Sequence, residues 1–120
     1  TRDFNYIDDT VNGFVAAAKN NKIIGQAINL GNSSEISVKD VVETVSKITK
    51  IKKKIDSEEK RIRPKKSEVD RLCASNIKAK KLLGWKPKYE GLKGFEKGLK
   101  LTVDWFKNEA NNEKSKDYNL

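Results

Sequence analysis

The residues best suited to chemistry in this 120-residue sequence are the arginines and the glutamate of residues 61–68. Arg61 and Arg63 stand two residues apart, Pro64 restricts the backbone after them, and Glu68 follows. An arginine side chain offers a planar fork of donors that grips phosphate oxygens in a bidentate manner. A carboxylate beside it can accept hydrogen bonds from ribose hydroxyls. Arginine with an acid suits a nucleoside diphosphate, whereas lysines alone would satisfy a solvated patch or a nucleic-acid contact.

A second pattern, Tyr89 and Lys93, has the spacing Tyr-x-x-x-Lys. On a helix this spacing would place the phenol and the ammonium on one face, where the lysine would lower the pKa of the phenol for acid–base chemistry. Only two positions are fixed in a lysine-rich chain, and no dinucleotide-binding segment precedes the pair. We therefore expect Tyr89 to pack and Lys93 to be solvated.

Structural roles explain the glycines and the single cysteine better than phosphate binding or catalysis does. Gly91, Gly94 and Gly98 are spaced like a phosphate-binding loop but fall inside a helical pattern, so they predict close helix packing. Cys73 has no histidine to activate it, because the chain contains none, and we expect it to be a buried small apolar residue. The lack of histidine also excludes a Ser-His-Asp triad and most zinc sites, and no metal ligands are predicted.

The charge of the chain is unevenly distributed. The formal net charge is +9, with a net charge of −2 in residues 1–45 and of +11 in residues 46–120. Such a surface attracts polyanions, namely nucleic acid or phosphate-bearing small molecules. Because 22 of the 26 basic residues are lysines, solvated lysine faces are the simpler interpretation.

Length and composition limit the class of protein. A chain of 120 residues suffices for one small domain, and no run approaches the roughly 18 apolar residues that a membrane span needs. No secretory signal is recognisable, and one cysteine cannot form an internal disulfide, so we expect a cytoplasmic protein. The sequence contains no methionine and opens in mid-pattern, which suggests a piece of something longer.

Hydrophobic spacing and turn residues predict a mostly helical chain with little sheet. So short a sheet needs further cover, which indicates a missing neighbour domain. Residues suited to helix capping stand at four predicted ends: Asp8 or Asp9, the Ser37 and Asp40 capping box, Ser75, and Gly84 as a left-handed C-cap. In chain order the predicted elements are a helix over 9–18, a strand over 26–30, a helix over 38–50, a weak strand over 51–56, a long loop over 57–71, a helix over 75–83, a helix over 92–106 and a polar, frayed tail over 108–120.

Five segments in register resemble one family, the extended short-chain dehydrogenase/reductases that act on nucleotide sugars. The match covers residues 1 to about 106, and its strength lies in the order of the motifs. The motifs are Thr1-Arg2-Asp3-Phe4-Asn5-Tyr6-Ile7-Asp8-Asp9, Ile28-Asn29-Leu30-Gly31, Ser37-Val38-Lys39-Asp40-Val41-Val42, Arg63-Pro64-Lys65-Lys66-Ser67-Glu68-Val69 and Ala79-Lys80-Lys81-Leu82-Leu83-Gly84-Trp85-Lys86-Pro87.

The resemblance implies an α/β fold in which residues 1–107 form a small, mostly helical C-terminal substrate-binding domain with a short sheet. Arg63 and Arg2 would contact the diphosphate, and Glu68 would lie at the ribose. In the family, a residue after the Asn-x-Gly strand end contacts the sugar nucleotide and is often an asparagine. By position Ser34 is the equivalent residue here, and it would lie near the ribose. The form of the loop at 67–69 is most similar to nucleotide-sugar 4,6-dehydratases, with a 4-epimerase as the alternative.

The same resemblance implies what this chain lacks. The family's glycine-rich NAD loop and catalytic Tyr-x-x-x-Lys belong to an N-terminal Rossmann domain, which would be the chain's partner and bind NAD. The chain alone would then be inactive, and the complete enzyme would be a homodimer. Within the complete enzyme, this chain would bind the nucleotide, and that binding energy would orient the sugar against the nicotinamide.

One alternative comes from another class: a small basic nucleic-acid-binding module. The charge of residues 46–120 and the cluster at 61–66 favour it. The aromatic residues Phe95, Trp105 and Phe106 disfavour it, because they fall on a helical core stripe and not among the basic residues, where bases would stack. We therefore expect a nucleotide-diphosphate-sugar as the ligand, and neither nucleic acid nor membrane.

Overall fold

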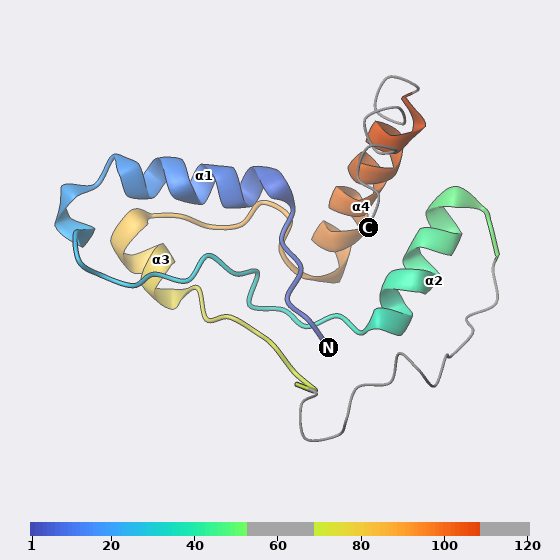
Figure 1. The fold of residues 1–120 in the computed structure, drawn as a ribbon, viewed down its shortest axis with the longest axis horizontal. Coiled ribbons are helices and arrows are strands. Elements are labelled where there is room, and N and C mark those ends of the chain that lie inside the picture. The colour runs from blue at the N-terminus through green and yellow to red at the C-terminus, as the bar shows by residue number, and fades with distance from the viewer. Residues whose placement is uncertain (53–68, 109–120) are drawn as a thin grey trace, which may run out of the picture.

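The computed structural model describes residues 1–52 and 69–108 of the chain (Figure 1). Helices α1 and α3 pack together at one end of the molecule, and α2 packs against α4 at the other. The predicted helical character is confirmed. The elements are α1 (Ile7–Ala18), the short 3-10 helix η1 (Asn21–Ile23), α2 (Val38–Thr49), α3 (Ile77–Leu83) and α4 (Gly91–Lys107).

The predicted short sheet is not found among the described residues. Residues 26–30 have no regular secondary structure, and none of the backbone groups of residues 27–30 bonds to another described backbone group. A strand exists only where a second strand completes its hydrogen-bond ladder, and this part of the structure offers none. The nearest equivalent is an antiparallel bridge between Arg2 and Ile36. Of the weak strand predicted over 51–56, only residues 51–52 lie within the described ranges, and they are not in a strand.

Two helix ends follow the sequence prediction. Ser37 and Asp40 form a capping box at the start of α2: Asp40 N donates to Ser37 Oγ at 3.0 Å, and Ser37 N donates to Asp40 Oδ2 at 3.2 Å. Gly84 ends α3 with a φ of +63°, the left-handed conformation that glycine adopts without steric cost. Both signals act within a few residues, so the local sequence is enough to specify them.

The predicted capping of α1 by Asp8 or Asp9 is wrong. The helix begins at Ile7 after Tyr6, which makes no side-chain cap, and both aspartates lie in the first turn. The Asp9 carboxylate instead accepts hydrogen bonds from Lys88 N at 2.8 Å and Tyr89 N at 2.9 Å. A distant segment therefore uses the side chain that the local pattern assigned to the helix.

Gly94 and Gly98 of α4 allow close packing, as predicted, but the prediction is wrong for Gly91, where a Cβ would meet nothing within 4 Å and the φ is +68°. A Cβ on buried Gly94 would lie 2.1 Å from the carbonyl carbon of Tyr89, and one on buried Gly98 would lie 3.1 Å from the Tyr6 ring. Tyr89 precedes α4 and packs on Tyr6 with ring centroids 4.6 Å apart, whereas Lys93 is exposed. The preferred interpretation of the tyrosine–lysine pair as packing and solvated residues is confirmed.

The buried apolar core of the described residues is small. It consists of Ile36, Ala79 and Trp85, while many large apolar side chains remain exposed. The predicted core position of Phe106 is wrong, because Phe106 and Trp105 are each about half exposed, at 47% and 48%. The C-terminal half of α4 projects past the elements on which its first turns pack (Figure 1). No described helix combines the length and apolar character required to cross a membrane.

Candidate functional site

The Asp3 carboxylate organises the loop of residues 31–34. Asp3 Oδ1 accepts from Asn32 N at 2.9 Å, and Asp3 Oδ2 accepts from Ser33 N at 3.1 Å and from Ala74 N at 3.0 Å. Three backbone donors from two segments thus converge on one side chain. Because hydrogen bonds to an ionised carboxylate are stronger than neutral ones, this contact joins the start of the chain, the loop and Ala74.

The loop is also tied to the segment before α3. Ser33 Oγ donates to Ala74 O at 2.9 Å and accepts from Asn76 N at 3.1 Å, and Asn76 Nδ2 donates to Gly31 O at 2.9 Å. A Cβ at Gly31 would lie 2.4 Å from the Cβ of Ala74, so only glycine permits this approach. The buried Asn76 side chain thus holds the loop through its Nδ2 and makes no cap hydrogen bond at the start of α3.

Asn32 connects the loop to the start of α4. Its side chain is 1% exposed and donates through Nδ2 to Phe4 O at 3.0 Å and to Tyr89 O at 2.8 Å. Its Oδ1 accepts from Gly91 N at 3.3 Å. A buried amide with this many partners rigidifies the elements that it joins.

Ser34, a predicted site residue, differs from its neighbours in the loop. Its Oγ is buried and has no hydrogen-bond partner, and it is the only such side-chain atom found in the described ranges. Leaving a buried hydroxyl unpaired is costly, so such a group needs an explanation other than stability. A ligand-binding role is one such explanation.

Arg2, the second predicted residue within the described ranges, lies where three segments meet. Its backbone pairs with Ile36, with both N–H···O distances at 3.0 Å. Its Nη1 donates to Val69 O at 2.8 Å. Ser34 is two residues from the pairing partner of Arg2, so the structure brings these two predicted residues onto adjoining segments.

The other two predicted residues, Arg63 and Glu68, lie outside the described residues. Val69 follows Glu68 directly in the sequence, and its carbonyl is held by Arg2. The hydrogen bond from Arg2 therefore fixes the first described residue after the segment in which both predicted residues lie.

An ion pair between Glu35 and Arg71 lies next to this junction, and the sequence analysis missed it. Arg71 Nε and Nη2 donate to the two carboxylate oxygens of Glu35 at 2.9 and 2.5 Å, and Thr1 Oγ1 donates to Oε1 at 2.8 Å. The hydrogen bonds from Arg71 and then Thr1 lower the pKa of Glu35 from 4.5 to about 2. Glu35 is therefore ionised at neutral pH, and its pair with Arg71 joins the loop to the segment after Val69.

The sequence also missed Asp3 as an organising residue, and it misplaced Cys73. Cys73 is exposed, contrary to the buried position expected for it. Loss of hydration at the thiol, with Asp3 and Glu35 nearby, raises the pKa of Cys73. A raised pKa disfavours the thiolate, so exposure does not make Cys73 an activated nucleophile.

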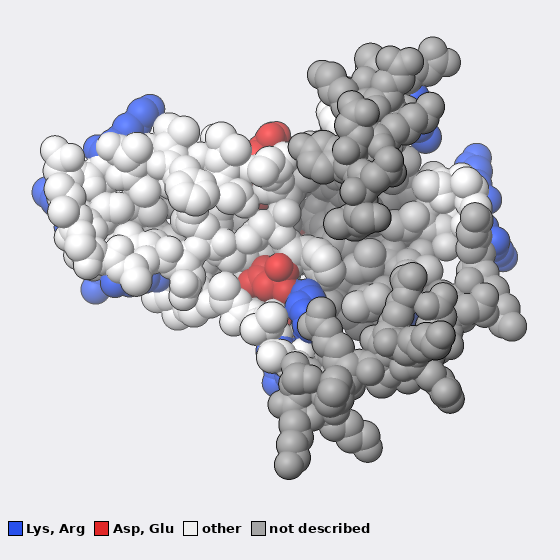
Figure 2. All heavy atoms as spheres, in the orientation of Figure 1, with Lys and Arg blue, Asp and Glu red and all other residues white. Residues whose placement is uncertain are grey.

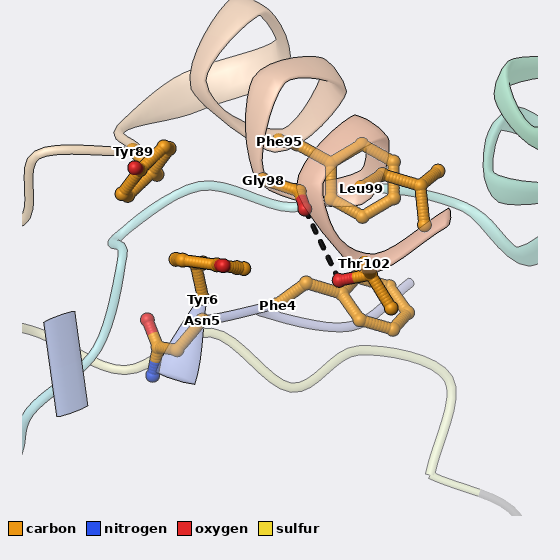
Figure 3. Close-up of a pocket in the computed structure, with 8 residues that line it drawn as sticks. All are labelled: Phe4, Asn5, Tyr6, Tyr89, Phe95, Gly98, Leu99 and Thr102. Atoms are coloured by element: carbon orange, nitrogen blue, oxygen red, sulfur yellow. Dashed lines mark hydrogen bonds between the residues drawn. The ribbon is translucent and has the colours of Figure 1, made fainter. Parts of the chain in front are cut away.

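A separate apolar hollow of about 170 Å³ lies between the start of the chain and α4 (Figure 3). The centroids of the Phe4 and Phe95 rings are 5.4 Å apart there, and Thr102 Oγ1 donates to Gly98 O at 3.1 Å. None of the described residues that line this hollow is charged, so this lining does not suit a diphosphate. Its lining residues are Phe4, Asn5, Tyr6, Tyr89, Phe95, Gly98, Leu99 and Thr102.

Comparisons with known proteins define the class. The family model described as GDP-mannose 4,6 dehydratase matches residues 1–100. UDP-glucuronate 4-epimerase from Thermodesulfobacterium geofontis is 37% identical over 107 residues, which cover 88% of this chain and 30% of the relative. UDP-glucose 4-epimerase from Halalkalibacterium halodurans is 36% identical over 94 residues, or 76% of this chain and 27% of the relative. UDP-glucuronic acid decarboxylase 1 from Danio rerio is 29% identical over 118 residues, or 98% of this chain and 26% of the relative.

The chain belongs to the extended short-chain dehydrogenase/reductase family of nucleotide-sugar dehydratases and epimerases. Within it, the matching family model is that of GDP-mannose 4,6 dehydratase. The chain spans less than a third of the length of these curated relatives. No solved structure gives a significant match.

Proposed function

We propose that this chain is the nucleotide-diphosphate-sugar binding part of an NAD-dependent nucleotide-sugar 4,6-dehydratase. Arg2 and Arg63 would hold the diphosphate, with Ser34 and Glu68 near the ribose. The observation that carries this proposal is the junction at Arg2, whose backbone pairs with Ile36 and whose guanidinium bonds to Val69 O. The orphaned hydroxyl of Ser34 supports it, because a ligand would give that hydroxyl a partner.

A 4-epimerase is the second candidate, and the names of relatives favour it. The relatives from Thermodesulfobacterium geofontis and Halalkalibacterium halodurans are both named as 4-epimerases. The two reactions would use the same nucleotide-binding residues of this chain. They would differ at the sugar, and none of the predicted residues of this chain is proposed to contact the sugar.

In this proposal, NAD binds to another part of the enzyme. Within residues 1–52 and 69–108, no glycine-rich loop stands between a strand and a helix, so these residues do not fit an NAD-binding role, and no hydride step is assigned to them. Their proposed contribution is to hold the nucleotide. Binding energy from that end of the substrate would orient the sugar for reaction elsewhere.

The surface of α1 supports a larger assembly around this chain. Ile7, Val11, Phe14 and Val15 recur along the helix and are between 45% and 67% exposed. In the face shown in Figure 2, the middle of the lobe formed by α1 and α3 shows no charged side chain, and Lys and Arg lie along its edges. Exposed apolar patches of this kind mark interaction surfaces, and the proposed partner is the NAD-binding Rossmann domain of the same enzyme.

The proposed function is tested with the full-length gene product, NAD and a panel of UDP-glucuronate, UDP-glucose and GDP-mannose. Binding is measured by calorimetry, and products by mass spectrometry and NMR. A product that has lost one water supports the dehydratase, and an isomer of unchanged mass supports the epimerase. Failure to bind any member of the panel would overturn the proposed function.

A further inference from the structure

We propose that Asp3 is a positioning residue that sets the conformation of residues 31–34 and through it the placement of the Ser34 hydroxyl. This inference rests on the proposed function, because it assumes that Ser34 contacts the nucleotide sugar. Asp3 stands in the first of the family motifs, but the resemblance gave it no role.

The first support is the geometry of the carboxylate. Both oxygens of Asp3 are engaged, one with Asn32 N at 2.9 Å and the other with Ser33 N at 3.1 Å and Ala74 N at 3.0 Å. An asparagine at this position would have to turn its NH₂ group toward at least one backbone donor. Two donors would then face each other, so the substitution removes an acceptor without changing the size of the side chain.

The second support is the backbone of Ser33. Its φ is +56°, in the left-handed region that residues other than glycine rarely adopt. Such a conformation persists only where the surrounding structure holds it. The hydrogen bond from Ser33 N to Asp3 supplies part of that restraint, and the Ser33 Oγ contacts to Ala74 O and Asn76 N supply the rest.

The third support is the position of Ser34 directly after these restrained residues. Asn32 and Ser33 are anchored through backbone and side chain, whereas Ser34 Oγ has no partner. The position of that hydroxyl is therefore set by the backbone conformation of the two residues before it. Releasing Asn32 N and Ser33 N from Asp3 would let the loop relax toward more common backbone conformations and move Ser34.

The test is a double-mutant cycle of Asp3→Asn and Ser34→Ala in the full-length gene product. KM and kcat are measured for the panel member, UDP-glucuronate, UDP-glucose or GDP-mannose, that binds most tightly. We expect Asp3→Asn to raise KM roughly tenfold while kcat stays within about twofold, since the Ser34 hydroxyl would move away from the nucleotide and only binding would be weakened. In the Ser34→Ala background the same substitution should raise KM less than about twofold, because the hydroxyl that it positions is already absent.

Asp9→Asn is the matched control, because Asp9 also accepts two backbone N–H bonds but holds Lys88 and Tyr89. It should lower thermal stability like Asp3→Asn and leave KM nearly unchanged. If Asp3→Asn does not fold, Asp3→Ser, whose hydroxyl keeps one acceptor, takes its place in the cycle. Equal effects of the Asp3 variant on KM in both backgrounds, or an effect on KM no larger than that of Asp9→Asn, would overturn the role of Asp3 and leave the proposed function standing. An unchanged KM in Ser34→Ala would instead remove Ser34 from the proposed site, and the inference with it.

Discussion

The indole Nε1 of Trp85 donates a 3.0 Å hydrogen bond to the backbone carbonyl of Asp9. Trp85 is 5% exposed and Asp9 is 2% exposed, so the bond lies in the interior. The two residues belong to motifs at opposite ends of the match to the family, and their contact closes α1 onto the turn after α3. It therefore forms part of the buried framework that holds α1 against the segment between α3 and α4.

Replacing Trp85 with phenylalanine should destabilise the protein by about 2–4 kcal/mol. The change removes buried apolar surface and leaves the carbonyl of Asp9 without its partner. Urea unfolding followed by circular dichroism measures the loss. Trp105→Phe is the control, since Trp105 is 48% exposed, and it should change stability by less than about 0.5 kcal/mol. Equal losses in the two variants would contradict the central position of Trp85.

The two buried glycines of α4 should respond differently to alanine. In a helix interior, alanine is favoured over glycine by up to about 1 kcal/mol, so any loss must come from packing. At Gly94 the new Cβ would overlap the backbone of Tyr89 at 2.1 Å, whereas at Gly98 it would meet the Tyr6 ring at 3.1 Å. Gly94→Ala should therefore cost about 1–3 kcal/mol, and Gly98→Ala clearly less. Thermal unfolding measures both, and the reverse order would contradict the packing described.

The ion pair of Glu35 and Arg71 predicts a dependence of stability on pH. The pKa of Glu35 is lowered from 4.5 to about 2 by the hydrogen bonds from Arg71 and Thr1. A lowered pKa means that the stabilisation is complete above about pH 4.5 and is lost as the pH falls toward 2. The difference in Tm between the unmodified protein and Glu35→Gln should thus shrink over this interval.

Arg71→Gln provides the check on that assignment, because it removes the other half of the pair. In the Arg71→Gln background, Glu35→Gln should have a smaller effect on Tm at pH 6 than it has alone. A difference in Tm that stays constant from pH 6 to pH 2 would show that Glu35 is not held ionised by this contact.

The elements specified by neighbouring residues could be predicted from the sequence. The capping box of Ser37 and Asp40 and the left-handed Gly84 need partners no more than a few residues away, and both are found. The strand over 26–30 could not be confirmed in the same way, because a strand needs a second segment to complete its hydrogen bonds. Likewise, the sequence could not show that Asp9 does not cap α1, because the backbone N–H groups of Lys88 and Tyr89 that bind its carboxylate lie far along the chain.

The candidate site shows the same limit. Motif resemblance identified Arg2 and Ser34, and the structure brings them onto adjoining segments. It did not identify Asp3, because the partners of its carboxylate lie 29, 30 and 71 residues further along the chain. Such long-range contacts leave no periodic or local signal in a single sequence.

The most direct test of the proposed function compares Arg63→Ala with Lys65→Ala in the full-length gene product. The two side chains are cations in the same segment, but only Arg63 is assigned to the diphosphate. Calorimetry should show that Arg63→Ala weakens binding of the panel's tightest nucleotide sugar by about 10- to 100-fold, with binding of NAD unchanged. Lys65→Ala should weaken it less than about threefold. Equal losses for both variants would mean a diffuse basic surface instead of a diphosphate site, and would contradict the account.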